Sequence, residues 1–332
     1  MKWWNSPEKD RQEHGVHLHA ICPLYALYDG ERRSIKQGIL FGLHCLKLIR
    51  EDWDVIDVDH MPFFPIIFTK IVCVLKHRKM SATWHEVWGR DYWVKYMGWK
   101  GNIAYIIERV SSLLPNTIVS VSELTTKLLS TSLNRDKHVT TIYSGIDIDT
   151  INKIPPHSIT SDIMYTGRLL THKNVDLMIE AVSLLKKQGQ HITCIIVGDG
   201  PEKENLINLA KKRGVAEHVV FYDFFPAHED VLGLMKSSKV FVFPSEREGF
   251  GLVALEANAC GIPFCTLNHT NNAAKYLIKS DNGSMFDHNA KSLAGSIGKH
   301  VQQKTDAKKY INAAKEYDWT KTINDLLHVY LL

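Results

Sequence analysis

Residues 244–263 read PSEREGFGLVALEANACGIP, and this stretch decides the fold class of the chain. The β-branched and aromatic run at 240–243 predicts a strand that ends at Phe243 and leads into a short loop. Gly249 and Gly251 then open a predicted helix, and Gly261 and Pro263 close it. A strand that passes through a glycine-rich loop into a helix is typical of parallel α/β sheets.

The start of this helix predicts an anion site, because glycines leave backbone N–H groups open there and the helix dipole favours negative charge. Glu248 stands in the loop directly before it. Glu256 lies inside the stretch 252–260, which is apolar except for Glu256 and Asn258. A glutamate in such a helix needs a partner. That partner is either a pair of sugar hydroxyls or a basic residue, unless Glu256 lies on an exposed rim.

The same alternation of strands and helices runs along the rest of the chain and predicts a doubly wound α/β architecture. Ten strands in one sheet would be unusual, so two Rossmann-like domains are expected, with a break at Pro155-Pro156. The predicted domains are residues 1–156 and 157–312, with a C-terminal helix at 313–332. The strands are expected at 16–21, 55–58, 80–84, 118–121, 139–143, 163–165, 192–197, 219–221, 240–243 and 263–266.

The composition excludes several classes of protein. Of the 332 residues, 45% are hydrophobic and 23% charged, which excludes disorder and coiled coil as descriptions of the whole chain. A net charge of +4 is too small to indicate nucleic-acid binding. Six scattered cysteines and a polar N-terminus indicate a reduced, cytoplasmic protein without a signal peptide. The apolar stretch 61–75 is short for a membrane span.

A second loop with phosphate-binding chemistry follows the predicted strand at 163–165. Arg168 and Lys173 lie in this strand-to-helix connection, where a diphosphate would sit. The turn Gly198-Asp199-Gly200-Pro201 is interpreted as mostly structural, since a lone G-x-G is weak evidence of a ligand site.

In the first domain, His85 follows a predicted strand and so lies at the ligand edge of that sheet. Six aromatic residues accompany it, and aromatic faces stack on sugar rings or lie at lipid head groups. The alternative is a tryptophan-rich helix packed in the core. The residues are Trp84, Trp88, Tyr92, Trp93, Tyr96 and Trp99.

The spacing Glu248-x7-Glu256 resembles the signature of the family 4 retaining glycosyltransferases, which have the B-type glycosyltransferase (GT-B) fold. The resemblance covers nearly the whole chain, because further motifs agree in order. They are Thr-Trp-His-Glu at 83–86, Val-Ser-Glu at 121–123, Ser-Gly-Ile-Asp at 144–147, Gly167-Arg168 with Lys173, Gly198-Asp199-Gly200-Pro201 and the quoted stretch. Asp318-Trp319 and the helix after it look like the element that crosses back to the first domain in this family.

The resemblance implies a hexosyltransferase-like enzyme with two domains facing a cleft, a UDP- or GDP-linked sugar donor, and no cofactor or metal ion. Arg168 and Lys173 would hold the diphosphate, and Gly249, Phe250, Gly251 and Leu252 would offer it backbone N–H groups. Glu256 would bind the ribose and Glu248 would face the donor sugar. His85 would contact that sugar from the acceptor side. The base would lie near Phe224 and Phe225.

Three departures from the family pattern stand out. The chain opens with Lys2-Trp3-Trp4-Asn5, which resembles the segment after the family's first strand-loop-helix unit, so that unit is expected to be absent. Ser144 stands where the family usually has asparagine. Residues 268–272 read NHTNN where the family usually has a Gly-Gly loop, which would alter recognition of the sugar or acceptor.

Three other functions remain open at this stage. The chain could be a truncated family member that binds a nucleotide or a partner without turnover. It could be a metal-dependent transferase of the other common fold, through Asp57-Val58-Asp59. An isomerase of the same two-domain fold would also take nucleotide sugars.

The acceptor is expected to be a glycan or a lipid-linked molecule. The apolar segment 62–75 and the basic run Lys76-His77-Arg78-Lys79 suit peripheral contact with an anionic membrane, at its inner face. The alternative is a buried helix followed by a solvated turn.

Overall fold

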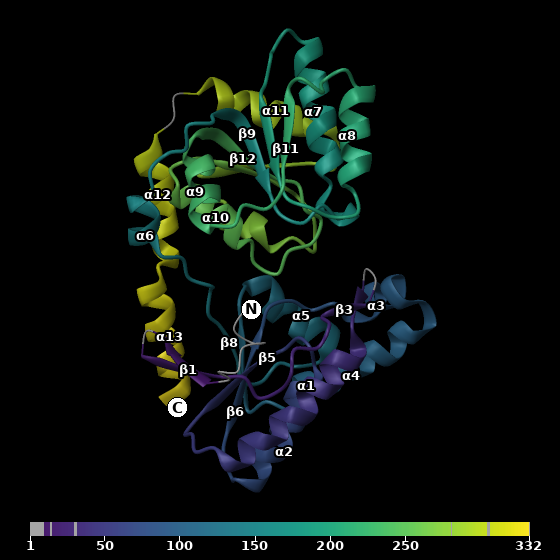
Figure 1. The fold of residues 1–332 in the computed structure, drawn as a ribbon, viewed down its shortest axis with the longest axis vertical. Helices are drawn as coiled ribbons and strands as arrows, with labels where there is room; N and C mark the ends of the chain where they lie inside the picture. The colour runs from purple at the N-terminus through teal and green to yellow at the C-terminus, as the bar shows by residue number, and fades with distance from the viewer. Residues whose placement is uncertain (1–9, 14, 30–31, 280, 304–305, 332) are drawn as a thin grey trace. The chain divides into compact units, whose positions relative to one another are not determined.

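The computed structural model describes residues 10–13, 15–29, 32–279, 281–303 and 306–331. Lys2-Trp3-Trp4-Asn5 lies outside these residues. The chain forms two compact units, which meet in sequence between Thr141 and Ile142 (Figure 1). Within the described residues no helix is long and apolar enough to cross a membrane.

The second unit is built on a six-stranded parallel sheet in the order β11-β10-β9-β12-β13-β14. The order reverses beside β9, because β10 lies on one side of it and β12 on the other. This reversal is the topological switch point of a doubly wound sheet. The strands are β9 (Ser161–Thr166), β10 (Cys194–Val197), β11 (Val219–Tyr222), β12 (Ser238–Phe243), β13 (Phe264–Leu267) and β14 (Gly283–Phe286).

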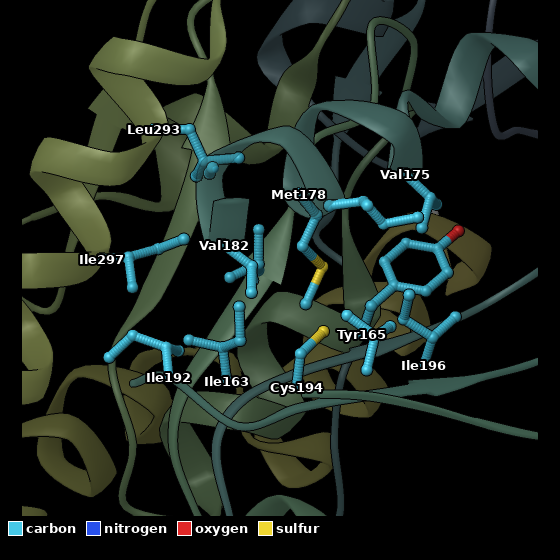
Figure 2. Packing of buried hydrophobic residues seen from close by; sticks show 14 of the residues in the cluster. Ile163, Tyr165, Val175, Met178, Val182, Ile192, Cys194, Ile196, Leu293 and Ile297 are labelled. Carbon is cyan, nitrogen blue, oxygen red and sulfur yellow. The ribbon is translucent and has the colours of Figure 1, made fainter. Parts of the chain in front are cut away.

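Helices cover both faces of this sheet, as its nearly continuous apolar strands require. On one face, Met178 and Val182 of α7 and Leu293 and Ile297 of α11 pack on strand residues such as Ile163 (Figure 2). The helices of the unit are α6 (Ile148–Lys153), α7 (Val175–Lys187), α8 (Lys203–Lys212), α9 (His228–Lys236), α10 (Leu252–Ala259), α11 (Ala290–Gln302), α12 (Ala307–Ala314) and α13 (Trp319–Leu331).

The first unit contains a four-stranded parallel sheet in the order β5-β6-β7-β8. Its core joins Ile66, Trp93 and Leu129 of three helices to Ala82 and Ile118 of the strands. The strands are β5 (Ile56–Asp59), β6 (Met80–Trp84), β7 (Thr117–Ser120) and β8 (Val139–Thr141), and the helices are α1 (Ile35–Cys45), α2 (Phe64–Leu75), α3 (Gly89–Met97), α4 (Gly101–Leu113) and α5 (Glu123–Leu133).

The α/β fold class with parallel sheets is confirmed, but the local structure differs from the predictions in two places. The strand expected at 16–21 is present as β2 (Val16–His19), but it pairs antiparallel with β1 (Asp10–Glu13) and does not join the parallel sheet. A similar two-residue ladder joins β3 (Tyr28–Asp29) and β4 (Arg32–Arg33). The edge strand β14 was not expected from the sequence, because Gly283 and Ser284 weaken the β signal.

The structural division also falls earlier than the proline pair at 155–156. Residues 142–153 belong to the second unit because they pack against its C-terminal part. Ile146 forms a β-bridge with Asp318, and Thr322 Oγ1 donates a hydrogen bond to the Tyr143 carbonyl at 3.0 Å. A Cβ atom on Gly145 would lie 2.9 Å from Trp319 Cα. The predicted return of the C-terminal helix to the first domain stays a prediction.

Candidate functional site

The loops after β9 and β12 diverge at the switch point of the second unit, which is where open α/β sheets bind their ligands. The first loop contains Gly167, Arg168 and Lys173. The second contains Glu248, Gly249 and Gly251. The structure therefore brings together the two loops that the sequence predicted to bind phosphate.

The loops after β9 and β10 interlock through glycines. Gly167 N–H donates to the Val197 carbonyl at 3.0 Å, and Leu169 N–H donates to the Asp199 carbonyl at 2.9 Å. A Cβ atom on Gly198, at φ +150°, would lie 2.0 Å from the Gly167 carbonyl oxygen. The Gly198-Asp199-Gly200 turn thus has the structural role predicted for it, since it lets the two loops pack backbone to backbone.

An ion pair spans the switch point between Lys173 Nζ and Glu248 Oε1. The two side chains are only 18% and 16% exposed. The Lys173 ammonium also lies 5.8 Å from the centre of the Phe243 ring. Asn174, in the left-handed conformation directly after Lys173, donates from Nδ2 to the Pro244 carbonyl at 3.2 Å and so ties the two loops together. These contacts hold the pair in place.

The backbone around Glu248 is fixed by the loop that follows β13. Glu248 N–H donates to the Asn271 carbonyl at 3.0 Å, and Ala273 N–H donates to the Glu248 carbonyl at 2.9 Å. Asn272 is fully buried and donates from Nδ2 to Thr266 Oγ1 at 2.9 Å. The segment 268–272 is therefore a support that positions Glu248.

Tyr165, at the end of β9, is fully buried beneath the first loop. Its hydroxyl donates to the Arg168 carbonyl at 3.1 Å. Burial raises the pKa of the Tyr165 phenol well above its ordinary value, and the nearby negative charge of Glu248 raises it further. Tyr165 thus stays a neutral donor that holds the backbone of Arg168, whose side chain is exposed.

The N-terminus of α10 begins at Gly251, which has a φ of +105°. A Cβ atom there would lie 2.6 Å from the Ala274 Cβ, so only glycine fits. The Phe250 ring is buried and lies 6.0 Å from the Tyr143 ring, which anchors the turn. No acidic residue lies in the first turn of α10, and Leu252 is exposed at its start. The helix dipole at this end is not offset by a carboxylate of its own first turn.

Glu256, on α10, is 13% exposed at its side chain and has a protein partner. Its Oε1 lies 3.0 Å from Nε2 of His228, the first residue of α9. This hydrogen bond raises the pKa of the His228 imidazole, against the opposing effect of partial burial. Pairing with a basic residue was one of the open alternatives for Glu256, and the structure shows that contact.

The two phenylalanines predicted to lie near a base directly follow β11. Phe224 is 51% exposed, and its ring lies 3.6 Å from where a Cβ on Gly198 would be. The Phe225 ring lies 5.7 Å from the Tyr222 ring. An exposed aromatic face thus stands at the end of β11, beside the glycine turn of β10.

His85 belongs to the first unit, at the carboxyl end of β6. Its Nε2 lies 2.8 Å from Asp59 Oδ1 at the end of β5. This hydrogen bond lowers the pKa of the Asp59 carboxyl group. The Asp59 carboxylate thereby orients the imidazole, and about half of the His85 side chain stays exposed.

The aromatic residues around His85 are mainly core. Trp84 and Trp93 are buried. The fully buried Glu108 accepts hydrogen bonds from Trp93 Nε1 at 2.8 Å, Trp88 N–H at 2.8 Å and Gly89 N–H at 3.0 Å. The structure favours the core interpretation for these residues, although Trp99 is exposed.

The two aspartates on β5 bind neighbouring side chains and do not form part of a metal-binding cluster in the described part of the chain. Asp57 accepts a hydrogen bond from Thr83 Oγ1 at 2.6 Å, and Asp59 pairs with His85. Among the residues that the structure describes, no three His, Cys, Asp or Glu side chains are grouped to hold a metal ion. The two parallel sheets also differ from the fold that this alternative required.

Comparison with known proteins identifies the family. Residues 149–317, half of the chain, match the family model described as glycosyl transferases group 1. The chain belongs to this glycosyltransferase family. The matched span contains both loops of the switch point.

Similar proteins agree with this family. The chain is 38% identical over 136 residues to the O-antigen biosynthesis glycosyltransferase WclY of Escherichia coli, covering 38% of the chain and 36% of WclY. It is 28% identical over 231 residues to the glycogen synthase of Mycobacterium tuberculosis, covering 67% of the chain and 55% of that enzyme. The chain therefore matches between about a third and just over half of the length of these relatives.

The fold of this glycosyltransferase family member also matches a solved structure. The Anabaena protein HepE, solved in complex with UDP, superposes with a TM-score of 0.72 at 19% identity, over 86% of this chain and 81% of HepE. The predicted GT-B fold is confirmed.

Four supporting residues of the glycosyltransferase site were missed as such from the sequence. They are Tyr165, Asn174, His228 and Asn272. Asn174 and His228 act through contacts with distant segments, Pro244 and Glu256, whereas Tyr165 and Asn272 bind residues close in sequence. Only Asn272 left a sequence signal, since its loop departs from the usual Gly-Gly pattern.

Proposed function

We propose that the chain transfers a sugar from a nucleoside diphosphate sugar to a glycan or lipid-linked acceptor, with retention of configuration and without a metal ion. The observation that carries this proposal is the Lys173–Glu248 ion pair at the switch point, beside the glycine-opened N-terminus of α10.

The donor diphosphate would lie between the two loops. Arg168, Lys173 and the first N–H groups of α10 supply positive potential from three directions. These groups would stabilise the negative charge that develops on the leaving diphosphate, which is the largest requirement of the reaction. Two cations and a helix N-terminus can do this without a divalent ion, which is why we propose metal independence.

Glu248 would face the donor sugar. Its carboxylate is oriented by Lys173 and by backbone bonds on both of its sides, so it can stabilise positive charge on the sugar ring as the leaving group departs. Glu256 would exchange His228 for the ribose hydroxyls, and Phe224 would stack on the base. His85 would contact the donor sugar from the acceptor side.

The comparisons support the substrate class. WclY is described as an O-antigen biosynthesis enzyme, and HepE binds UDP. We therefore propose a UDP- or GDP-linked sugar as donor, and a polysaccharide or glycolipid precursor as acceptor.

Donor turnover by the Glu248→Gln variant tests this proposal, with Glu246→Gln as the matched control. Glu246 lies two residues away in the same loop and pairs with His288 at 3.6 Å rather than with Lys173. We expect Glu248→Gln to lower the turnover of the accepted nucleotide sugar by about a hundredfold or more, and Glu246→Gln to leave it within a few-fold. Full activity in Glu248→Gln would contradict the assigned role. Loss of activity on adding a chelator would contradict metal independence.

A further inference from the structure

Three helices of the first unit carry large apolar side chains on their solvent faces. On α2, Ile71, Val74 and Leu75 are 46–66% exposed, and on α4, Ile103, Ile106, Val110 and Leu113 are 45–58% exposed. On α1, Ile35, Ile39 and Leu43 are 37–56% exposed. Scattered exposed leucines are ordinary on a soluble domain, whereas ten large aliphatic side chains on three helices form a patch that needs a partner.

The spacing puts these side chains on one stripe of each helix. Ile103, Ile106, Val110 and Leu113 follow the i, i+3, i+7, i+10 pattern of a single helix face. On α2 the exposed stripe lies opposite Ile66 and Cys73, which pack in the core. On α2 and α4, one apolar face therefore packs in the core while the other is exposed.

The three helices are connected through α2. Gly42 of α1 touches α2 so closely that a Cβ atom there would lie 2.7 Å from the Phe68 ring. α4 contacts α2 as well. Helix α2 therefore has α1 and α4 as neighbours. We refer to their combined solvent face, with the ten side chains named above, as the helical patch.

The charged residues on α1 and α2 and in the segments directly after them are all basic. Residues 35–50 and 64–79 contain seven lysines and arginines and no aspartate or glutamate. Lys36, Lys47, Arg50 and Lys79 are exposed. The glutamate of α4, Glu108, is buried and turned to the tryptophan cluster, whereas Arg109 is exposed. After α2, Arg78 lies 3.9 Å from Asp52 and 3.8 Å from Asp54.

We infer that the helical patch docks on a membrane surface rich in anionic lipid. Exposed aliphatic side chains with lysine and arginine on the same helices or directly after them are typical of segments that lie in the head-group region. A second copy of the chain fits less well, because two such cationic faces would repel each other. This inference concerns a surface outside the donor site and holds independently of the proposed reaction.

Vesicle co-sedimentation of the full chain tests the inference. We expect binding to phosphatidylcholine vesicles that contain phosphatidylglycerol, little binding to phosphatidylcholine alone, and release in high salt. The double variant Ile71→Asp/Val74→Asp should weaken binding by at least about tenfold, because two apolar contacts are lost and two negative charges added. The matched control is Val220→Asp, an equally exposed apolar position (45%) on β11 of the second unit.

A second variant guards against misfolding. Lys36→Glu/Arg50→Glu changes only exposed charges and should also reduce binding to anionic vesicles by about tenfold. Absence of wild-type binding at low salt would overturn the inference. So would equal binding by all variants, or a concentration-dependent dimer that the aspartates dissolve while vesicles have no effect. Nucleotide titration of the same samples reports on the donor site separately, so failure of one proposal is distinguishable from failure of the other.

Discussion

Replacing Lys173 by methionine separates the structural and the chemical roles of the ion pair at the switch point. The substitution keeps the length of the side chain but removes its charge, so the Glu248 carboxylate, 16% exposed, loses its cationic partner. A hydrogen bond to a charged group contributes about 1.5–3 kcal/mol, and breaking a fully buried pair costs about 3–5 kcal/mol. Because some solvent still reaches Glu248, we expect Lys173→Met to lower the free energy of unfolding by about 2–3 kcal/mol.

The double variant Lys173→Met/Glu248→Gln removes both charges and leaves no unpaired ion. We expect it to be more stable than the sum of the two single variants predicts, with a coupling energy of about 1–2 kcal/mol. Both measurements use urea unfolding followed by circular dichroism, without ligand. Donor turnover should not recover in the double variant as stability does, because the double variant lacks both groups proposed to act on the donor.

Two results would refute this reasoning. Strictly additive losses of stability would mean that Lys173 and Glu248 do not interact in solution. Recovery of donor turnover in the double variant would mean that neither charge takes part in the reaction.

Three further predictions test the surroundings of the site. Gly198→Ala should lower the free energy of unfolding of the second unit by more than about 2 kcal/mol in urea, because the new Cβ would collide with the Gly167 carbonyl. Gly214 is also at positive φ but has open space around it, so Gly214→Ala should cost only about 1–2 kcal/mol. Equal losses in the two variants would contradict this explanation. Glu108→Gln should lower the melting temperature of the first unit, because the carboxylate that accepts hydrogen bonds from three N–H groups becomes a neutral amide. Hydrogen bonds to the charged group contribute on the order of 3 kcal/mol to stability. An unchanged melting temperature would show that Glu108 does not anchor the tryptophan cluster. The contact with Glu256 raises the pKa of His228 and stabilises the fold by less than about 1 kcal/mol, because the His228 side chain is largely exposed. This stabilisation is full below the unfolded pKa of about 6.5 and is lost as the pH rises through the raised folded pKa. The difference in unfolding free energy between wild type and His228→Gln across that pH range measures it, and a difference that grows with pH would contradict the contact.

The sequence was sufficient for the strand-loop-helix pieces and for most of the residues at the strand ends, because those signals are local. Their position directly after apolar runs was enough to single out the glycines Gly249 and Gly251 and the cations Arg168 and Lys173. The pairing of Lys173 with Glu248 could not be predicted, since it depends on β12 lying beside β9. Strand order is a property of the whole sheet and leaves no mark at either loop.

The same reasoning explains where the sequence misled. The proline pair at 155–156 marked a break in the local pattern, but the division of the chain depends on Ile146 bridging to Asp318, far along the sequence. The tryptophans near His85 left two interpretations open until Glu108 was seen to bind Trp93. In each case a contact between residues distant in sequence determined the structure, and the local sequence pattern does not contain that information.

Calorimetric titration with UDP, GDP and ADP, with and without chelator, tests the central claim most directly. We expect one of these nucleotides to bind with a Kd on the order of micromolar and the chelator to have no effect. Arg168→Ala should weaken this binding, while Glu246→Gln should not. A folded protein that binds none of the three, or that binds one equally well in the Arg168→Ala variant, would contradict a donor site at the switch point.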